Sequence, residues 1–195
     1  MKIESYALEA WHGPKGITKK IYAGATGLEI GIIGASLDTQ KMIDHAIQIG
    51  GKNLRHMGFH ERAKILKALA IYLSERKEQL YQLNHLTGAT RKDGWIDIDG
   101  GIGTLMVYAS KGRKEMPDGK IYLDGSTEQL SRKGTFLGQH IHVPKQGVAI
   151  HINAFNFPIW GMLEKFSQSF LAGMPVIIKP ASDTAYLAEA CFRMI

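Results

Sequence analysis

The sequence lacks the features of an extracellular, membrane-bound or metal-dependent protein. It has a single cysteine, Cys191, among 195 residues, so no internal disulfide can form, as is usual in a reducing cytosol. No apolar run reaches the roughly 18 residues that cross a bilayer, and Glu4 and Glu9 interrupt the stretch where a signal peptide would be apolar. Among eight histidines, the most closely spaced pair is His140-x-His142, and on a strand this indicates a surface pair. We therefore expect a cytoplasmic protein with no metal and no membrane partner.

A concentrated basic patch is also missing, although the formal net charge is +6. Lysines and arginines are interleaved with acidic residues, and the densest basic cluster, at residues 111–120, includes Glu115 and Asp118. This distribution is typical of a solvated surface rather than of a face that follows phosphates. We therefore expect no nucleic-acid partner. The alternative, a basic nucleic-acid-binding protein, predicts that the chain is retained on DNA with a steep dependence on salt concentration.

Residues 1–116 are predicted to form an extended arm followed by three helices. The first 35 residues are rich in glycine and β-branched side chains, which favours short strands. Apolar residues then recur at helical spacing, and either Ser36 or Asp38 is suited to cap the first helix. The expected helices run from this cap to about Gly50, from Phe59 to about Leu83, and from Trp95 to about Arg113.

The two longer helices carry further expectations. In the second helix, solvent is expected to contact Glu61, Arg62 and Lys64, and Gly88 is the expected stop. Its apolar side is expected to comprise Ile65, Leu66, Leu69, Ala70, Tyr72 and Leu73. The third helix contains glycines that each cost about 1 kcal/mol relative to alanine but suit a close helix–helix approach: Gly100, Gly101 and Gly103.

Residues 117–146 differ in character and predict an antiparallel excursion of two or three strands. Alternating residues from Lys120 and from Gln139 predict strands, with turns at residues 124–126 and 133–134. Gly125-Ser-Thr-Glu128 resembles a phosphate-binding turn, but it precedes any strand–helix unit, so we interpret it as an ordinary turn.

Residues 147–195 predict the first strand–helix–strand unit of a parallel sheet. An apolar strand at 148–152 precedes a helix at 158–171, a second apolar strand at 175–179 and a helix from Asp183. The predicted fold class is therefore α/β, with N-terminal helices, an antiparallel β excursion and the start of a doubly wound parallel sheet.

Two polar side chains follow the carboxyl ends of these strands, where open parallel sheets bind ligands. The Asn156 amide could donate to a developing oxyanion, and Lys179 could donate to ribose hydroxyls or phosphate. In the simpler interpretation, Asn156 caps the following helix and Lys179 is a solvated strand end.

An ordered set of motifs then resembles the aldehyde dehydrogenase superfamily. Within about 35 residues it comprises Asn156-Phe-Pro, Lys165, Ala172-Gly173 and Lys179-Pro180. Glu61-Arg-Ala, Thr87-Gly-Ala-Thr-Arg, residues 95–105 and residues 151–158 match more narrowly the dehydrogenase halves of bifunctional phenylacetic acid degradation proteins. Ala154 and Phe155 depart from the Pro-Trp common in the wider family, as they do in this subgroup.

The resemblance implies roles for individual residues. Asn156 would lie in the oxyanion hole, and Lys165 would support proton movement unless it is only a solvated helix residue. Ser182 stands where NAD-specific relatives often carry a glutamate, which favours NADP, with NAD as the alternative. The remaining implied cofactor-binding residues are Ile152, Asn153, Ala154, Phe155 and Lys179.

The resemblance also implies the reaction and its limits. Full-length relatives oxidise an aldehyde to the carboxylic acid through a cysteine thiohemiacetal, and the subgroup implies a CoA-linked semialdehyde. The family's nucleophile and general base come later than Ile195, and Cys191 is expected to be a structural residue, so we expect this chain alone to be inactive. We also expect a homo-oligomer of the full-length enzyme that uses the excursion. The alternative is a non-catalytic nucleotide-binding module.

Overall fold

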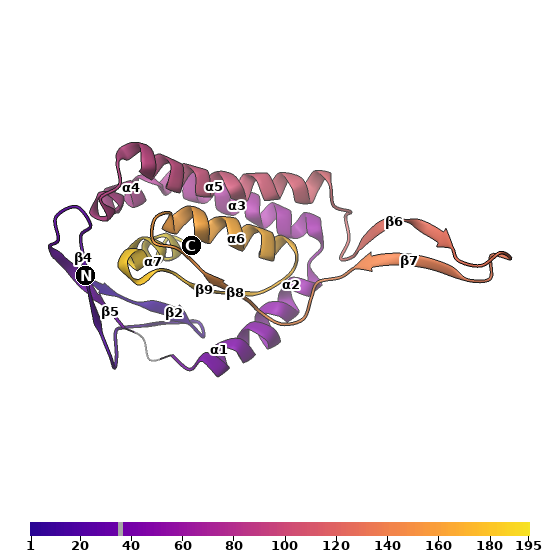
Figure 1. Ribbon diagram of the computed structural model, residues 1–195, viewed down its shortest axis with the longest axis horizontal. Coiled ribbons are helices and arrows are strands. Elements are labelled where there is room, and N and C mark those ends of the chain that lie inside the picture. Colours follow the sequence, from indigo (N-terminus) through magenta and orange to yellow (C-terminus); the bar gives the residue numbers. More distant parts are fainter. Residues whose placement is uncertain (35–36) are drawn as a thin grey trace.

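The computed structural model describes residues 1–34 and 37–195. Figure 1 shows a body of packed helices over a small parallel sheet, a group of short strands at one end, and a long hairpin that projects from the other end. Of the two residues expected to cap the first helix, Ser36 lies outside the described residues. Asp38 is the cap, because its side chain accepts a hydrogen bond from the Lys41 backbone N–H.

The N-terminal arm forms two small sheets, as its composition predicts. One sheet has the order β1-β5-β4, with β1 parallel and β4 antiparallel to β5, and the other is the β2–β3 hairpin. The strands are β1 (Lys2–Ile3), β2 (Ser5–Ala7), β3 (Ala10–His12), β4 (Lys19–Tyr22) and β5 (Glu29–Ile33).

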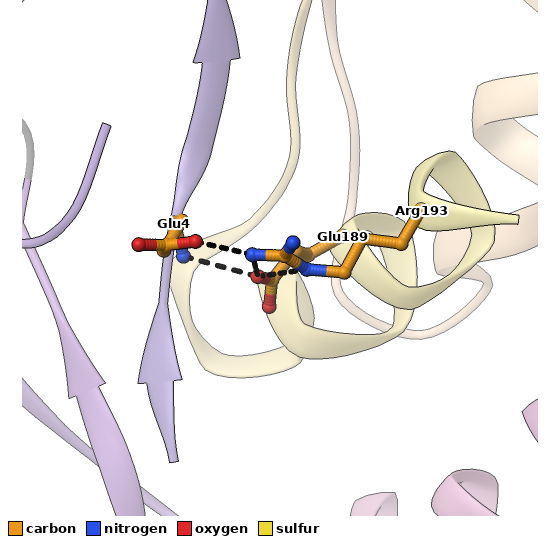
Figure 2. A network of polar contacts seen from close by, with 3 residues as sticks. All are labelled: Glu4, Glu189 and Arg193. Atoms are coloured by element: carbon orange, nitrogen blue, oxygen red, sulfur yellow. Dashed lines mark hydrogen bonds and ion pairs between the residues drawn. The ribbon is translucent and has the colours of Figure 1, made fainter. Parts of the chain in front are cut away.

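Figure 2 shows how the arm is fastened to the C-terminal helix α7 (Ala185–Arg193). The Arg193 guanidinium pairs with Glu4 of the arm and, at 2.9 Å, with Glu189 one turn earlier in α7. It also lies 3.8 Å from the centre of the Trp11 ring. Residues nearly 190 positions apart are therefore held together, and the arm belongs to the same body as α7.

The first helix extends past Gly50, where it was predicted to end. Helices α1 (Thr39–His45) and α2 (Lys52–His56) are joined without interruption by a π-helical turn, η1 (Ala46–Gly51). A Cβ atom on Gly50 would lie 3.2 Å from Pro175 Cβ. The glycines at this point therefore admit a neighbouring segment instead of ending the helix.

Arg62 is the clearest departure from the predicted pattern of α3 (Phe59–Arg76). It was assigned to solvent but is 0% exposed. Its Nη1 atom donates to the carbonyls of Leu54 at 2.9 Å and Met57 at 2.8 Å, and so satisfies free acceptors at the end of α2. Conversely, Ile65 and Tyr72 are 43% and 40% exposed, although both were placed on the apolar side. Helical spacing alone cannot identify an arginine that caps another helix.

The second predicted helix otherwise forms as expected, and its stop is confirmed. Helix α3 continues after Lys77 as α4 (Glu78–Asn84) and the 3-10 turn η2 (His85–Thr87). Gly88 ends the segment in the left-handed region, with φ of 83°. The buried side chains of α3 and α4 that join the core include Leu66, Ala70, Leu73 and Leu80.

Helix α5 (Arg91–Lys114) begins four residues before the predicted start, because Thr90 and Asp93 form a capping box there. It packs against α3 on one side and α6 (Pro158–Leu171) on another. A Cβ atom on Gly101 would lie 2.9 Å from Trp160 Cα. The close helix–helix approach is therefore confirmed at Gly101 and at Gly100, where a Cβ atom would lie 2.6 Å from the Trp160 ring, but it is wrong for Gly103, which faces open space.

We expect Gly101→Ala to lower the free energy of unfolding by about 1–3 kcal/mol, because the new methyl group meets the backbone of α6. Gly103→Ala is the matched control, since no described residue outside the adjoining turns of α5 comes within 4 Å of the Cβ position there. It is expected to gain up to about 1 kcal/mol from helix propensity. Urea unfolding of both variants tests the packing, and equal effects at the two positions would contradict it.

The excursion is a two-stranded antiparallel hairpin of β6 (Tyr122–Gln129) and β7 (Leu137–His142). The predicted turn near Gly134 is confirmed, with Gly134 at φ of 66°. The prediction of a turn at Gly125-Ser-Thr-Glu128 is wrong, because these residues lie inside β6. The register shifts there between Asp124 and Glu128, so the glycine belongs to a bulge.

The C-terminal part forms the predicted parallel unit. Strands β8 (Ala149–Ile152) and β9 (Val176–Lys179) pair in parallel, connected by α6, and the 3-10 turn η3 (Ser182–Thr184) leads into α7. Helix α6 covers one face of the pair, while Ile150 and Ile152 on the other face are 59% and 71% exposed. Within the described parts of the chain, none of the helices has the length and apolar character needed to cross a membrane.

Candidate functional site at the strand ends

The ends of the two parallel strands lie side by side. Ile152 is the register partner of Lys179, and the Asn153 backbone N–H donates to the Lys179 carbonyl at 3.1 Å. Asn156 follows three residues later, in the loop between β8 and α6. The structure therefore brings the two predicted segments together at the carboxyl edge of the sheet, where open parallel sheets bind their ligands.

Asn156 is exposed and does not cap helix α6. The N-cap position belongs to Phe157, which makes no side-chain capping bond, and Pro158 occupies the first turn. Among residues 1–34 and 37–195, no group forms a hydrogen bond with the Asn156 side chain, so its amide is available to a ligand. The capping interpretation of Asn156 is therefore wrong.

Lys179 and Ser182 follow strand β9. The Lys179 side chain is exposed, and its Nζ atom donates to the carbonyl of Pro180 at 3.2 Å. Ser182 is half-buried and begins η3, the short turn that leads into α7. Thr184, at the end of that turn, donates through Oγ1 to the Phe155 carbonyl at 3.1 Å. This bond ties the segment after β9 to the loop that carries Asn156.

Lys165 is held against the strand end rather than free in solvent. Its Nζ atom donates to Asn153 Oδ1 at 2.9 Å and to the Ile152 carbonyl at 3.3 Å. Asn153 itself is 5% exposed, and its Nδ2 atom is buried with no hydrogen-bond partner in the described part of the chain. The interpretation of Lys165 as a merely solvated helix residue is therefore wrong.

His151 on β8 makes a further polar contact with α6. His151 is buried, and its Nε2 atom lies 3.1 Å from Ser169 Oγ. Burial lowers the pKa of the His151 imidazole, and the nearby Lys165 charge lowers it further. The imidazole is therefore neutral at physiological pH.

The other predicted cofactor-binding residues form an open apolar surface. Ile152 is 71% exposed and Phe155 is 64% exposed, and Ala154 between them is also exposed. Exposed apolar side chains next to free polar groups are suited to a ligand with a flat apolar part and polar substituents.

Asp97 is a residue of this region that the sequence did not indicate. It lies on α5, is 2% exposed, and its Oδ1 atom accepts from the backbone N–H groups of Ile159 at 3.0 Å and Trp160 at 2.7 Å. Asp99, two residues later, instead contacts Lys77 and Tyr81. Both acids stand in the same apolar–acidic alternation, so no local signal distinguishes the buried one.

Cys191 has no nucleophilic character. It is 0% exposed, and burial raises the pKa of its thiol to about 12, with the Asp97 charge acting in the same direction. A thiol with such a pKa stays protonated at neutral pH. The prediction that Cys191 is structural agrees with this environment.

Two surface depressions lie away from the strand ends. One, of about 470 Å³, is lined by residues of α4 and α5, among them Arg91 and Trp95, and by Lys77 between α3 and α4. The other, of about 360 Å³, lies between α3, α4 and α7. Neither contains a predicted site residue, and the candidate site itself is an open edge of the sheet.

A parallel strand pair with the exposed polar side chains of Asn156 and Lys179 at its carboxyl edge is typical of α/β proteins, whose open sheets bind ligands at strand ends. The sequence pattern of the aldehyde dehydrogenase family matches residues 19–195. The chain belongs to the aldehyde dehydrogenase family.

Individual relatives place this chain within the family. It is 35% identical over 191 residues to the 3,4-dehydroadipyl-CoA semialdehyde dehydrogenase of Aromatoleum evansii, covering 97% of this chain and 37% of that protein. It is 30% identical over 178 residues to the D-glyceraldehyde dehydrogenase (NADP(+)) of Picrophilus torridus, covering 89% of this chain and 34% of that protein. The chain thus spans little more than a third of the length of these relatives.

The fold agrees with solved structures of the family. An E. coli NADP-dependent enzyme superposes with a TM-score of 0.80 at 22% identity, over 99% of this chain and 39% of that one. A Mycobacterium tuberculosis aldehyde dehydrogenase complexed with NAD+ gives a TM-score of 0.79 at 21% identity, with the same two coverages. The architecture is therefore that of a partial aldehyde dehydrogenase fold.

Proposed function

We propose that this chain is the N-terminal, cofactor-binding portion of an NADP-dependent aldehyde dehydrogenase that oxidises an aldehyde to a carboxylic acid. The observation that carries the proposal is the Asn153-to-Lys179 backbone bond, which joins the two strand ends beside Asn156. The loop amide and the lysine then border one edge of the sheet, as a shared ligand requires.

The residues at this edge fit a dinucleotide. Lys179 would donate to the ribose or phosphate oxygens, and the exposed Ile152, Ala154 and Phe155 would contact apolar parts of the cofactor. Asn153 would keep the strand end in place through Lys165. When bound, the nicotinamide would accept a hydride.

The choice between the two cofactors depends on Ser182. Its short, uncharged side chain at the start of η3 leaves room for a 2′-phosphate and does not repel it electrostatically. One relative is named as NADP-dependent, whereas a structural neighbour was solved with NAD+. We therefore propose NADP, with NAD as the alternative.

The chemical role follows from the free amide. Asn156 would donate a hydrogen bond to the oxyanion of the substrate without changing its own charge. Lys165, held at the carbonyl of Ile152, would support proton movement beside it. Since the relative from Aromatoleum evansii is named as a CoA-semialdehyde dehydrogenase, we propose a CoA-linked semialdehyde as the substrate. The motif resemblance described above favours one from phenylacetate degradation.

We expect Lys179→Met to weaken NADP binding about tenfold or more, the loss expected for one hydrogen bond to a charged group. Thermal-shift titration with NADP measures this loss. Lys133→Met, an exposed lysine in the hairpin turn, is the matched control and is expected to bind normally. Equal NADP affinity in both variants would overturn the proposed site.

Ser182→Glu is expected to reverse the cofactor preference. A carboxylate at this position repels a 2′-phosphate but accepts hydrogen bonds from free ribose hydroxyls. The ratio of NADP to NAD affinity, measured by parallel titrations, should therefore fall. An unchanged ratio would show that Ser182 does not contact the adenosine ribose.

We further propose that the full-length enzyme is a cytoplasmic homo-oligomer that uses the hairpin. Leu123 and Ile141 are register partners on one face of the hairpin and are 54% and 56% exposed. A ribbon with exposed apolar pairs is suited to contact with another protein surface.

A second candidate function is a non-catalytic nucleotide-binding module, with which the absence of a reactive cysteine among the described residues is compatible. The coding sequence after Ile195 decides between the two. An in-frame continuation with a glutamate and a cysteine supports the dehydrogenase.

A further inference from the structure

The loop that carries Asn156 receives little support from its own sequence. Helix α6 starts directly after it, and the N-cap residue Phe157 offers no side-chain acceptor to the free N–H groups of the first turn. Pro158 removes one of these donors but leaves those of Ile159 and Trp160. The orientation of the loop therefore depends on groups from other elements.

Asp97 supplies the missing acceptor from α5. One carboxylate oxygen bonds both free N–H groups, although Asp97 lies more than 60 residues earlier in the chain. The approach is possible because Gly101, one turn later on α5, leaves no Cβ atom against the Trp160 backbone. A carboxylate at the N-terminus of a helix also complements the positive end of its dipole.

Hydrogen bonds to residues at the end of β9 and in η3 also hold the loop in place. The Thr184 hydroxyl bonds the Phe155 carbonyl, and the Asn153 N–H bonds the Lys179 carbonyl. Asn156 thus lies between Phe155 and the first turn of α6, both of which are anchored. Its own amide has no partner among the described residues, so its position is set by these anchors.

A buried carboxylate is an energetically unfavourable helix cap if it serves stability alone. Its second oxygen, Oδ2, is buried and has no partner among the described residues. Such an orphaned acceptor loses solvation without compensation, and each case calls for an explanation. Positional control of the neighbouring loop supplies one, because a shorter hydroxyl cap on α6 itself would leave the loop untied to α5.

From these contacts we infer that Asp97 is a positioning residue, which fixes the direction in which Asn156 and the loop at 153–156 face the cofactor. The inference rests on the proposed function, because it concerns the same site. We infer that the loop direction is set by the position of the Asp97 oxygen that accepts the two N–H groups, and not by the negative charge of the carboxylate.

Two substitutions separate position from charge. Asp97→Asn keeps an oxygen at the same place and removes the charge, whereas Asp97→Glu keeps the charge and moves the oxygens by one methylene. Hydrogen exchange followed by mass spectrometry on the 195-residue chain reports the loop and first turn at residues 155–161, with α3 as the internal reference. NADP affinity is measured on the same samples.

The expected result is loss of protection at residues 155–161 in Asp97→Glu, with α3 still protected and NADP affinity reduced about tenfold. Asp97→Asn is expected to recover both the protection and the affinity. If Asp97→Glu does not fold, Asp97→Ser takes its place, since its shorter side chain also leaves the two N–H groups unbonded.

The remaining outcomes oppose one claim or the other. Loss of protection that spreads equally over α3 would mean a merely structural role and overturn the inference, as would unchanged protection and affinity in Asp97→Glu. Failure of the unsubstituted chain to bind NADP would instead overturn the proposed function, which distinguishes the two failures.

Discussion

The 195-residue chain mixed with NADP and an aldehyde is expected to reduce the cofactor no faster than a buffer blank. The reaction of this family requires a cysteine thiolate as nucleophile. The single cysteine of the sequence, Cys191, is 0% exposed, and its thiol pKa is raised to about 12 by burial. At pH 8 roughly one such thiol in ten thousand is ionised, and no aldehyde reaches it.

Absorbance of the reduced nicotinamide measures this rate directly. Cys191→Ala is the matched control and is expected to give the same blank rate, with a small loss of stability from the buried cavity. Turnover by the unsubstituted chain that disappears in Cys191→Ala would contradict the structural role of this cysteine. Turnover that persists in both would contradict the thiolate mechanism.

The buried carboxyl of Asp97 is expected to make the free energy of unfolding depend on pH. Burial raises the pKa of its carboxyl to about 6 from the usual 3.8, against the opposing effect of the Trp160 and Ile159 hydrogen bonds. The folded chain therefore binds a proton more tightly than the unfolded chain. The contribution of Asp97 to the free energy of unfolding is highest below the unfolded pKa, falls between about pH 4 and pH 6, and is constant above.

A shift of about two pH units corresponds to about 3 kcal/mol. The Asp97→Asn side chain cannot ionise, so the free energy of unfolding of this variant should lack this fall. Relative to the unsubstituted chain, the variant should therefore gain about 3 kcal/mol of stability from acid to neutral pH. Urea unfolding at several pH values measures it.

Asp93→Asn, in the same helix, is the control with the opposite sign. Bonds from Thr90 lower the pKa of the Asp93 carboxyl, so the stability that it contributes is present at neutral pH and is lost as the pH falls through the folded pKa. Identical pH slopes for the unsubstituted chain and Asp97→Asn would mean that the buried carboxylate is not penalised.

Local patterns were sufficient for most elements of the fold. Helical spacing located α3 and α6, and the two apolar runs around Asn156 located β8 and β9, because one buried face produces each pattern. Gly100 and Gly101 of α5 were rightly associated with close packing, whereas Gly103 was not. The division into 1–116, 117–146 and 147–195 as separate regions stays a prediction.

The sequence could not indicate residues whose role depends on distant partners. Arg62 stands among charged residues of α3, yet it is buried because it caps α2. Asp97 differs from Asp99 only through its contact with α6, which lies about 60 residues later. Gly50 resembled a helix stop because the π-helical turn and its contact with Pro175 leave no local signature.

The sequence likewise indicated some residues of the candidate site and not others. The motif order alone suggested the positions of Asn156, Lys165, Lys179 and Ser182, and the structure places them around one edge of the sheet. Their proposed roles toward a cofactor and substrate are still predictions. The bonds that hold the loop, from Asp97 and Thr184, come from tertiary packing and required coordinates.

Hydrogen exchange of the chain with and without saturating NADP is the most direct test of a nucleotide site shared by the two strand ends. We expect protection to increase together at residues 152–157 and 179–184, while the hairpin at 122–142 is unchanged. Protection at only one of these segments, or at the depression lined by Lys77 and Trp95 instead, would contradict the site.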